Sequence, residues 1–522
     1  MADQKRPDVL TLHAQLRPDK LAVIDDRPDG TTMAWTFAEL ECQANRLANA
    51  LLSLGVRPRD KVVWCGQNSP AVVRMGHAAR KIAATSVPLN YRLSPEEMIY
   101  VVDNCDAVLV YADAEFRDVF TKIRPSIPKV RHVVIFDGAP AASMLDGDAL
   151  LPVASERPPQ IDAGRTAAAT MIYTSGTTGH PKGALRVGGG DPEQVAQLIG
   201  FIGYTPDDVY LTTGPLYHSG PGGFLVLAHG LGNTAILQRK FDAEDWLRLV
   251  DKYRVTTTFS APTPIRLVSN LPAAVKARYD RGSMKRMIAN AAPWSYALKE
   301  AYLADFSEDS LWEVYGSTEL GVDTILAPPD QRRKPGSCGK AAPGVSIALF
   351  DEDGREITEA NTPGELYVKS KSVFTTYYKD TDKYERSRRG DFLSVGDVAY
   401  RDEEGFYFIC DRKSDMIISG GVNIYPAEIE AALEHHPHIL DVAVFGIPSE
   451  QWGESVHAVV VAQNGAQLTE FDVITFAREH LAGYKVPRSV SFLEEIPRTG
   501  SGKILKRTLR EPFWQGHKTR VL

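Results

Sequence analysis

The segment from Tyr173 to Gly183 combines the residue types that bind phosphate. It reads Tyr-Thr-Ser-Gly-Thr-Thr-Gly-His-Pro-Lys-Gly, so that hydroxyl groups alternate with glycines and a lysine follows. Glycines let backbone N–H groups approach an anion, hydroxyls add donors, and a lysine adds positive charge. It is not a Walker A loop, because Lys182 lies between Pro181 and Gly183. The segment predicts a triphosphate site, although such a stretch alone is more often an ordinary flexible loop.

Three further segments with chemically active side chains follow in a fixed order. They are residues 315–319 (Tyr-Gly-Ser-Thr-Glu), residues 394–397 (Ser-Val-Gly-Asp) with 411–413 (Asp-Arg-Lys), and residues 497–503 (Pro-Arg-Thr-Gly-Ser-Gly-Lys). With the first segment they resemble the adenylate-forming superfamily of acyl-CoA synthetases, luciferases and peptide-synthetase adenylation domains. The resemblance runs from about Leu21 to about Arg507. Each motif is moderately specific alone, and the four in this order are specific together.

The resemblance implies an ATP site built around the first segment. Its residues would cradle the β- and γ-phosphates until pyrophosphate leaves: Thr174, Ser175, Gly176, Thr177, Thr178, Gly179 and Lys182. Glu319 and Thr174 would hold Mg²⁺ through oxygen atoms, which are hard ligands for a hard ion, and Thr318 would contact the α-phosphate. For Glu319 alone, the alternative is a glutamate that begins a helix and favours its dipole.

The adenine and ribose positions also follow from the resemblance. Tyr315, beside Gly316, would stack on adenine, and its alternative is a core aromatic. Asp397 would accept hydrogen bonds from the ribose hydroxyls, to which Arg412 would donate. Taken alone, a Gly-Asp pair is usually a turn and a lone arginine is usually on the surface. The residues that border adenine in relatives match Ala291, Ala292 and Pro293.

Lys503 is the residue that we most expect to act in catalysis. Its charge would bridge the carboxylate and the α-phosphate, where anionic charge is most crowded; a solvated lysine in a C-terminal loop is the alternative. In the family, the C-terminal domain then turns, withdraws this lysine and presents the segment Ser419-Gly420-Gly421 to a pantetheine tunnel. Thiol attack on the mixed anhydride gives the thioester and AMP without a covalent enzyme intermediate.

The acyl pocket is expected near His218, which matches a family position close to the carboxylate and the thiol entrance. A structural histidine is the alternative. The segment Leu216-Tyr217-His218 contains no acidic residue to pair with an α-ammonium group, which disfavours an amino-acid substrate. Trp294 is a candidate for the floor of the cavity. Glycines imply space for the acyl group at positions 214, 220, 222 and 223.

Two segments depart from the family pattern. Residues 186–191 (Arg-Val-Gly-Gly-Gly-Asp) replace the usual Thr-His or Ser-His helix start, which predicts an unusually mobile loop. Ser414 replaces the Asp or Lys that commonly forms the hinge of the family. The hinge itself, at residues 412–414, remains an expectation.

The pattern of elements predicts an α/β protein. Helices are expected over residues 37–54 and 71–81, and strands over residues 61–65, 107–111 and 167–173. They form a large N-terminal body with two α/β sheets, and short strands after Pro335 add a small β-barrel or meander. The AMP-binding domain thus comprises residues 1–411, and a small mobile α+β domain comprises residues 415–522.

Composition excludes several classes of protein. The net charge of −7 argues against a nucleic-acid surface. Five scattered cysteines indicate neither a disulfide framework nor a zinc site. No apolar run reaches the roughly 18 residues of a membrane span. A cytoplasmic protein is expected, and a homodimer is an option that the sequence leaves open.

Two patterns resemble sites but lack the necessary context. Residues 230–235 fit GxGxxA, yet residues 224–229 before them are not clearly a strand, so dinucleotide binding is disfavoured. The histidines at 435, 436 and 438 lie at a helix end without nearby carboxylate or thiolate partners, which favours a solvated cap region over a metal site.

We therefore predict an ATP-dependent, AMP-forming acyl-CoA synthetase. ATP, Mg²⁺ and CoA are its expected cofactors and co-substrates, and its acid is hydrophobic: medium- or long-chain, branched or aromatic. One alternative loads the pantetheine of a carrier protein instead of free CoA. A luciferase-like oxygenase and a non-catalytic adenylate sensor are two others.

Overall fold

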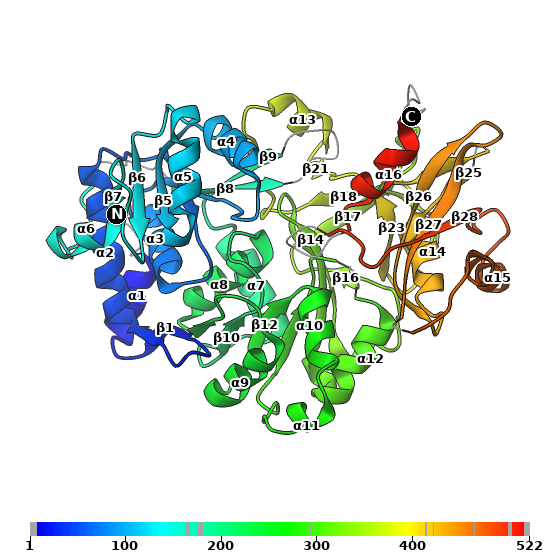
Figure 1. Cartoon of the computed structure of the whole chain (residues 1–522), viewed down its shortest axis with the longest axis horizontal. Helices are drawn as coiled ribbons and strands as arrows, with labels where there is room; N and C mark the ends of the chain where they lie inside the picture. Colours follow the sequence, from blue (N-terminus) through cyan, green and yellow to red (C-terminus); the bar gives the residue numbers. More distant parts are fainter. Residues whose placement is uncertain are drawn as a thin grey trace.

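The computed structural model describes residues 8–161, 167–174, 181–292, 294–412, 415–420, 422–463, 465–498 and 504–515. Figure 1 shows a large body and, at its right, a smaller lobe that contains the C-terminal part of the chain. In these residues the body holds three β-sheets and the lobe a fourth. No helix among them is long and apolar enough to cross a membrane.

The first sheet of the body has the strand order β19-β9-β8-β4-β3-β5-β6-β7. Its strands from β8 to β7 run parallel, whereas β9 and β19 are antiparallel to their neighbours. Helices cover both faces, so the central strands β3, β5 and β6 are largely apolar and buried. The strands are β3 (Lys61–Cys65), β4 (Thr85–Pro88), β5 (Ala107–Asp113), β6 (His132–Phe136), β7 (Leu145–Asp146), β8 (Ala169–Thr174), β9 (Lys182–Val187) and β19 (Thr376–Tyr377).

Local signals define the helices on this sheet. Thr36 and Glu39 form a reciprocal capping box at the start of α2. Ser69 caps α3, which has Pro70 in its first turn. The helices are α2 (Phe37–Ser53), α3 (Pro70–Lys81), α4 (Pro95–Asn104), α5 (Arg117–Ile123) and α6 (Gly147–Val153).

The second sheet has the order β16-β15-β14-β13-β12-β10-β11-β1-β2 and is parallel from β14 to β1. Its strands are β1 (Leu21–Asp26), β2 (Thr32–Thr36), β10 (Val209–Thr212), β11 (Thr234–Leu237), β12 (Thr257–Ser260), β13 (Arg286–Ala289), β14 (Leu311–Ser317), β15 (Gly321–Leu326) and β16 (Lys340–Ala341). Its helices are α7 (Pro192–Ile202), α8 (Ser219–Leu231), α9 (Ala243–Tyr253), α10 (Pro262–Ser269), α11 (Ala273–Lys276) and α12 (Tyr296–Asp305), and α1 (Val9–Leu16) packs on α2 and α8.

Two buried histidines join α3, of the first sheet, to α8, of the second. His77 Nε2 lies 3.0 Å from His229 Nδ1. His229 Nε2 lies 3.1 Å from the Ala22 carbonyl, and Arg80 donates to His77 Nδ1 at 2.8 Å. Every hydrogen bond in this series has one donor and one acceptor when each imidazole carries a single proton, on Nε2. Both imidazoles are therefore neutral in this arrangement.

The third sheet is the small β unit predicted after Pro335. It is antiparallel, with the order β20-β21-β18-β22-β23, and β17 pairs with β18. Its elements are β17 (Ser346–Phe350), β18 (Gly364–Lys369), β20 (Arg388–Arg389), β21 (Phe392–Leu393), β22 (Asp397–Arg401), β23 (Tyr407–Arg412) and the neighbouring helix α13 (Thr381–Arg386).

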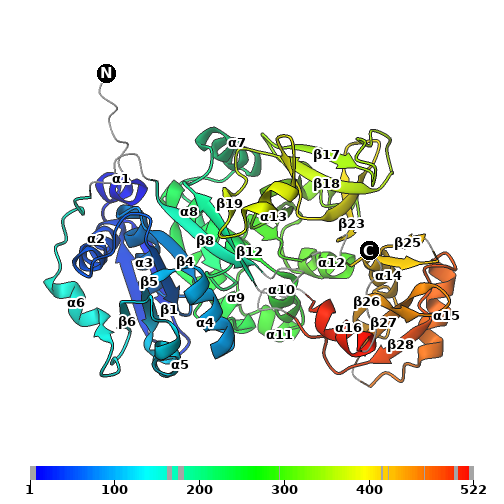
Figure 2. The same ribbon diagram turned by 90° about the horizontal axis from the view of Figure 1, so that it is seen from above.

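The C-terminal lobe is α+β, as expected. Its sheet has the order β25-β24-β27-β26, and β28 pairs with β27. Figure 2 shows the lobe beside the body in a second view. Its elements are β24 (Ile417–Ser419), β25 (Val422–Ile424), β26 (Ile439–Ser449), β27 (Gly453–Ala462), β28 (Ser489–Phe492), α14 (Pro426–Leu433), α15 (Glu470–His480) and α16 (Lys506–Trp514).

Most of the predicted elements match within a few residues. The strand predicted over 61–65 is β3, and the helix predicted over 37–54 is α2. Residues 224–229 lie within α8, so the GxGxxA pattern does lack its strand. His435 Nδ1 lies 2.8 Å from the Ala431 carbonyl, as suits a side chain at a helix end.

Candidate active site

The motif Tyr-Gly-Ser-Thr-Glu ends β14 and forms the tight turn into β15. A Cβ atom at Gly316 would lie 1.9 Å from the Gly321 carbonyl oxygen, so only glycine fits there. Gly321 has φ +93°, a left-handed conformation that favours glycine. Glu319 therefore lies in a hairpin turn between strands, and the alternative of a glutamate at a helix start is wrong.

Glu319 joins the predicted phosphate segment to this hairpin. Its carboxylate is buried, and Oε1 accepts hydrogen bonds from Thr174 Oγ1 at 3.1 Å and Tyr377 Oη at 3.0 Å. Thr174 is the last residue of β8, and Tyr377 lies on β19 of the same sheet. A carboxylate and two hydroxyls form a set of hard oxygen donors, which fits Mg²⁺. Tyr377 was not among the residues selected from the sequence.

Thr318 contacts the start of α8. Its Oγ1 lies 2.8 Å from Ser219 Oγ, and Ser219 is the first residue of that helix. His218 is the N-cap residue, and its ring packs on Tyr217 with centroids 4.3 Å apart. The fold therefore brings the start of α8 next to Thr318, and the place of His218 near the carboxylate and the thiol remains a prediction.

Asp397 and Arg412 are register partners on β22 and β23. Arg412 Nε lies 3.2 Å from Asp397 Oδ1, and the Tyr315 phenol donates to Asp397 Oδ2 at 2.5 Å. Burial, and then the charge of Asp397, raise the pKa of Tyr315 well above its usual value, so the phenol keeps its proton. Three residues predicted to contact adenine and ribose are thus joined by one hydrogen bond and one ion pair.

Cationic side chains gather beside Glu319. Lys182, the first residue of β9, pairs with Asp380, and this hydrogen bond lowers the Asp380 pKa. Burial, and then the charge of Lys182, lower the pKa of Lys383. Lys383 also senses the charges of Glu319 and Arg412, so it belongs to the same neighbourhood. Lys383 lies in no motif that would single it out in the sequence.

The turn after β13 lies next to β14. Asn290 donates through Nδ2 to the Val314 carbonyl, and its Oδ1 accepts from the Ala291 backbone. Ala291 has φ +71°, so this side chain sustains a left-handed turn that carries Ala292. The turn thus stands beside the strand of Tyr315, and its contact with adenine remains a prediction. Trp294 packs in the core against Tyr302 of α12, and its place at the floor of the acyl cavity remains a prediction.

The expectation that glycines provide space for the acyl group holds only at Gly223, where a Cβ atom would meet nothing within 4 Å. A Cβ at Gly220 would lie 2.3 Å from Phe259 Cζ. At Gly222 it would lie 2.8 Å from the Leu216 carbonyl oxygen, and at Gly214 2.9 Å from the Pro221 ring. Three of the four glycines serve close packing instead.

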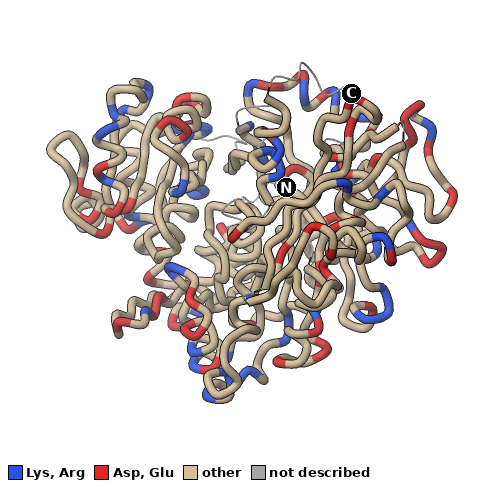
Figure 3. The backbone as a smooth tube through the Cα atoms, turned by 45° about the vertical axis from the view of Figure 1, so that its right-hand side comes forward, with Lys and Arg blue, Asp and Glu red and all other residues tan. Residues whose placement is uncertain are grey.

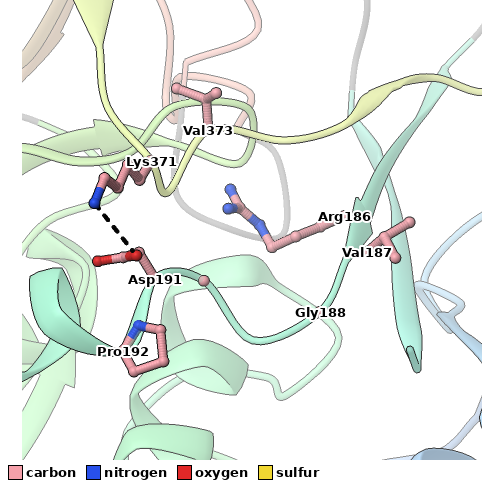
Figure 4. Close-up of a pocket in the computed structure, with 8 residues that line it drawn as sticks. Arg186, Val187, Gly188, Asp191, Pro192, Lys371 and Val373 are labelled. Carbon is pink, nitrogen blue, oxygen red and sulfur yellow. Dashed lines mark ion pairs between the residues drawn. The ribbon is translucent and has the colours of Figure 1, made fainter. Parts of the chain in front are cut away.

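Arg186 is not part of a loop, contrary to expectation. It lies on β9, donates to the Thr318 carbonyl at 3.0 Å and also bonds the Ser372 carbonyl. Figure 4 shows it beside a cavity of about 320 Å³, where Lys371 pairs with Asp191 at 3.6 Å. Burial lowers the Arg186 pKa. Through its bond to Thr318, this arginine connects β9 to the hairpin that carries Glu319.

Asp323 is fully buried on β15, and neither carboxyl oxygen has a hydrogen-bond partner in the described part of the chain. Burial, and then the charge of Asp397, raise its pKa well above the usual value. The charge of Arg186 acts in the opposite direction. Asp323 was not predicted from the sequence, because an aspartate within a strand pattern has no distinguishing motif.

Several predicted site residues lie outside the described residues: Ser175, Gly176, Thr177, Thr178, Gly179, Pro293, Ser414, Gly421 and Lys503. Gly420 is described, and its amide donates to the Trp452 carbonyl at 2.8 Å within the C-terminal lobe. The structure therefore places it with β24 and β25 and not with Glu319.

In the view of Figure 3, basic and acidic residues are interspersed over the described part of the chain, without a basic stripe.

Known proteins resemble this chain over almost its whole length. It is 34% identical to indoleacetate–CoA ligase of Aromatoleum aromaticum over 96% of each chain. It is 32% identical to the fatty acid–[acyl-carrier-protein] ligase ScoC of Streptomyces coeruleorubidus, over 97% of this chain and 95% of that protein. The ATP-bound crystal structure of MatB from Rhodopseudomonas palustris superposes with a TM-score of 0.85 at 30% identity, covering 98% of this chain and 100% of that one.

Two family matches agree with these similarities. Residues 10–378 match the AMP-binding enzyme family, and residues 428–503 match the AMP-binding enzyme C-terminal domain. The second match falls on the separate sheet that follows β23. The chain therefore belongs to the AMP-binding enzymes, the adenylate-forming superfamily that includes the acyl-CoA synthetases.

Proposed function

We propose that this chain is an AMP-forming acyl-CoA synthetase that activates a hydrophobic carboxylic acid. The observation that carries the proposal is the convergence of three distant segments on the hairpin of Thr318 and Glu319: Thr174 and Tyr377 bond Glu319, and Ser219 bonds Thr318. In the same site, Asp397 accepts a hydrogen bond from Tyr315 and pairs with Arg412, an arrangement suited to a nucleoside.

In the first half-reaction, a carboxylate oxygen of the acid attacks the α-phosphorus of ATP, and pyrophosphate leaves. Two anions must meet, so cations and oriented donors determine the rate. Lys182 is suited to neutralise phosphate charge, and Lys503 is proposed to bridge the two reacting groups. Mg²⁺, held by Glu319 and Thr174, would supply further charge neutralisation.

In the second half-reaction, the thiol of CoA attacks the acyl carbon, the thioester forms, and AMP leaves with the electron pair of the broken C–O bond. The residues proposed at the thiol entrance are His218, Gly420 and Gly421. A turn of the C-terminal lobe about residues 412–414 is proposed between the two half-reactions. The cytoplasmic location and the homodimer remain predictions.

A carrier-protein acceptor is the second candidate. The similarity to ScoC, whose name specifies an acyl-carrier protein, supports it. The relatives' names cover aromatic and fatty acids, which supports a hydrophobic acid for this chain. Aromatic and fatty acids are therefore the first substrates to test.

Acid-dependent exchange of labelled pyrophosphate into ATP tests the first half-reaction, without CoA. We expect exchange that requires Mg²⁺, and Glu319→Gln should reduce it by about a hundredfold, the order of effect of losing a charge-stabilising group. Glu41→Gln is a matched control, since Glu41 is equally buried but pairs with Lys81 far from Glu319. Exchange that is absent with every acid, or equal losses in both variants, would contradict the proposal.

A further inference from the structure

The helix α14 of the C-terminal lobe lacks a cap from its own N-terminus. Tyr425, which precedes it, makes no side-chain cap hydrogen bond. Instead the Ala427 backbone amide donates to Asp411 Oδ2 at 3.0 Å. Asp411 lies on β23, which belongs to the third sheet of the body. The cap therefore comes from the other side of the boundary between body and lobe.

A partly buried ion pair supports the same contact. Lys506, the first residue of α16, lies 2.8 Å from Glu430 Oε1 and 3.9 Å from Asp411 Oδ2. Glu430 belongs to α14 and also accepts from the Val444 amide at 2.7 Å, which fixes it within the lobe. In Figures 1 and 2 the ribbons of β23 and α14 lie side by side. The start of α16 and the start of α14 thus meet on one carboxylate of the body.

We propose that Asp411 is a positioning residue that holds the C-terminal lobe in its adenylating orientation by capping α14 across the boundary. This inference rests on the proposed function. Asp411 precedes the proposed hinge, whereas Ala427 and Lys506 follow it, so a turn of the lobe separates them. The contact therefore belongs to one orientation alone.

Two observations indicate that this orientation of the lobe is the adenylating one. Asp411 is adjacent to Arg412, which pairs with Asp397 at 3.2 Å. Lys506 stands three residues after Lys503, and three residues span at most about 11 Å. We therefore assign the orientation in which Lys506 lies beside Asp411 to adenylation, the step in which Lys503 is proposed to act.

The test compares the two half-reactions in single variants. Asp411→Ala removes the cap, and we expect the rate of acyl-adenylate formation to fall about fivefold, the usual effect of deleting an N-cap. Thioester formation from supplied acyl-adenylate should not fall. Asp411→Asn keeps an acceptor for Ala427 and should restore the wild-type ratio of the two rates.

Thr469→Ala is the matched control, because Thr469 caps α15 within the lobe. It should lower the melting temperature and leave the ratio of half-reactions unchanged. The proposal is overturned if Asp411→Ala leaves the ratio unchanged, or if Thr469→Ala shifts it equally.

A distance measurement that needs no catalysis tests this proposal independently of the proposed function. Spin labels at Val153→Cys in the body and Phe471→Cys in the lobe, both exposed sites, report the distance between the two parts. Cys42 and Cys410, the cysteines that are not buried, are replaced by serine in every variant. Asp411→Ala should add a second distance population that Asp411→Asn lacks. Identical distributions would overturn the positioning role even in an active enzyme, and a shift in an inactive one would support it.

Discussion

The Tyr315 phenol donates a hydrogen bond of 2.5 Å to Asp397, although 82 residues separate them in sequence. The other Asp397 oxygen faces Arg412 Nε at 3.2 Å. One aspartate is thereby oriented by two donors, each from a different motif. The positions proposed for adenine and ribose are consequently coupled, and a change at either one should affect the binding of the whole nucleotide.

Tyr315→Phe keeps the aromatic ring and removes only this hydrogen bond. Because the acceptor is a carboxylate, we expect the KM for ATP to rise about tenfold, with a smaller change in kcat. Steady-state kinetics at saturating acid measure both. Tyr302→Phe, which loses a buried hydrogen bond to Ser310 outside the site, should lower stability alone. An unchanged KM in Tyr315→Phe would show that the pair does not serve the nucleotide.

Lys503→Ala should abolish acyl-adenylate formation and largely spare thioester formation from supplied acyl-adenylate. The reason is that the charge of Lys503 is proposed to act only where the carboxylate meets the α-phosphate. Rapid-quench assays of the two half-reactions measure the difference. Equal loss of both steps would contradict this role.

The histidine pair between α3 and α8 should make stability depend on pH. Burial lowers the pKa of His229 to about 4 and places that of His77 well below its usual value. The unfolded chain therefore takes up protons near pH 6.5 that the folded chain does not accept until about pH 4. The contribution of the two histidines to the free energy of unfolding is fully present above pH 6.5. It falls as the pH decreases toward 4, by about 1.4 kcal/mol per pH unit for each histidine.

Thermal unfolding between pH 7 and pH 5 measures this slope. The double variant His77→Gln/His229→Gln retains hydrogen-bonding groups but does not titrate, so its slope should be flatter. The same slope in both proteins would mean that other groups dominate the acid response.

Asp323→Asn should stabilise the protein at pH 8. Burial raises the Asp323 pKa, so the folded state holds its proton to a higher pH than the unfolded chain does. The contribution to stability consequently falls as the pH rises above the unfolded value of about 3.9. An amide of the same shape removes that loss, and we expect Tm to rise by about 2 °C or more.

Asp208→Asn provides the contrast. Asp208 is also buried, but it pairs with Arg286 at 3.0 Å and accepts from Thr256 at 2.8 Å. Its loss of charge should lower Tm. If both variants lower Tm to the same extent, Asp323 has a partner that balances its burial.

The sequence predicted those parts of the fold that depend on local pattern. The strand β3 and the helix α2 followed from the periodic pattern of their apolar residues. The motif order also indicated Glu319, Asp397 and Arg412. These residues could be found because their types are chemically restricted and their spacing resembles a known family.

Residues that act through tertiary contact escaped prediction. Tyr377 and Lys383 reach Glu319 only after β19 joins the first sheet. The cap from Asp411 to α14 joins β23 of the third sheet to a helix of the C-terminal lobe. The glycines before and within α8 were misinterpreted for the same reason, because Phe259, which fills the space at Gly220, comes from another strand.

The central claim is the formation of a thioester with release of AMP. The most direct measurement is mass spectrometry of the purified protein with ATP, Mg²⁺ and a mixed pool of fatty and aromatic acids, with and without CoA. The account predicts AMP and an acyl-CoA that forms only when CoA is present. An acyl-adenylate that accumulates regardless of CoA would contradict it and would indicate a carrier protein or another acceptor.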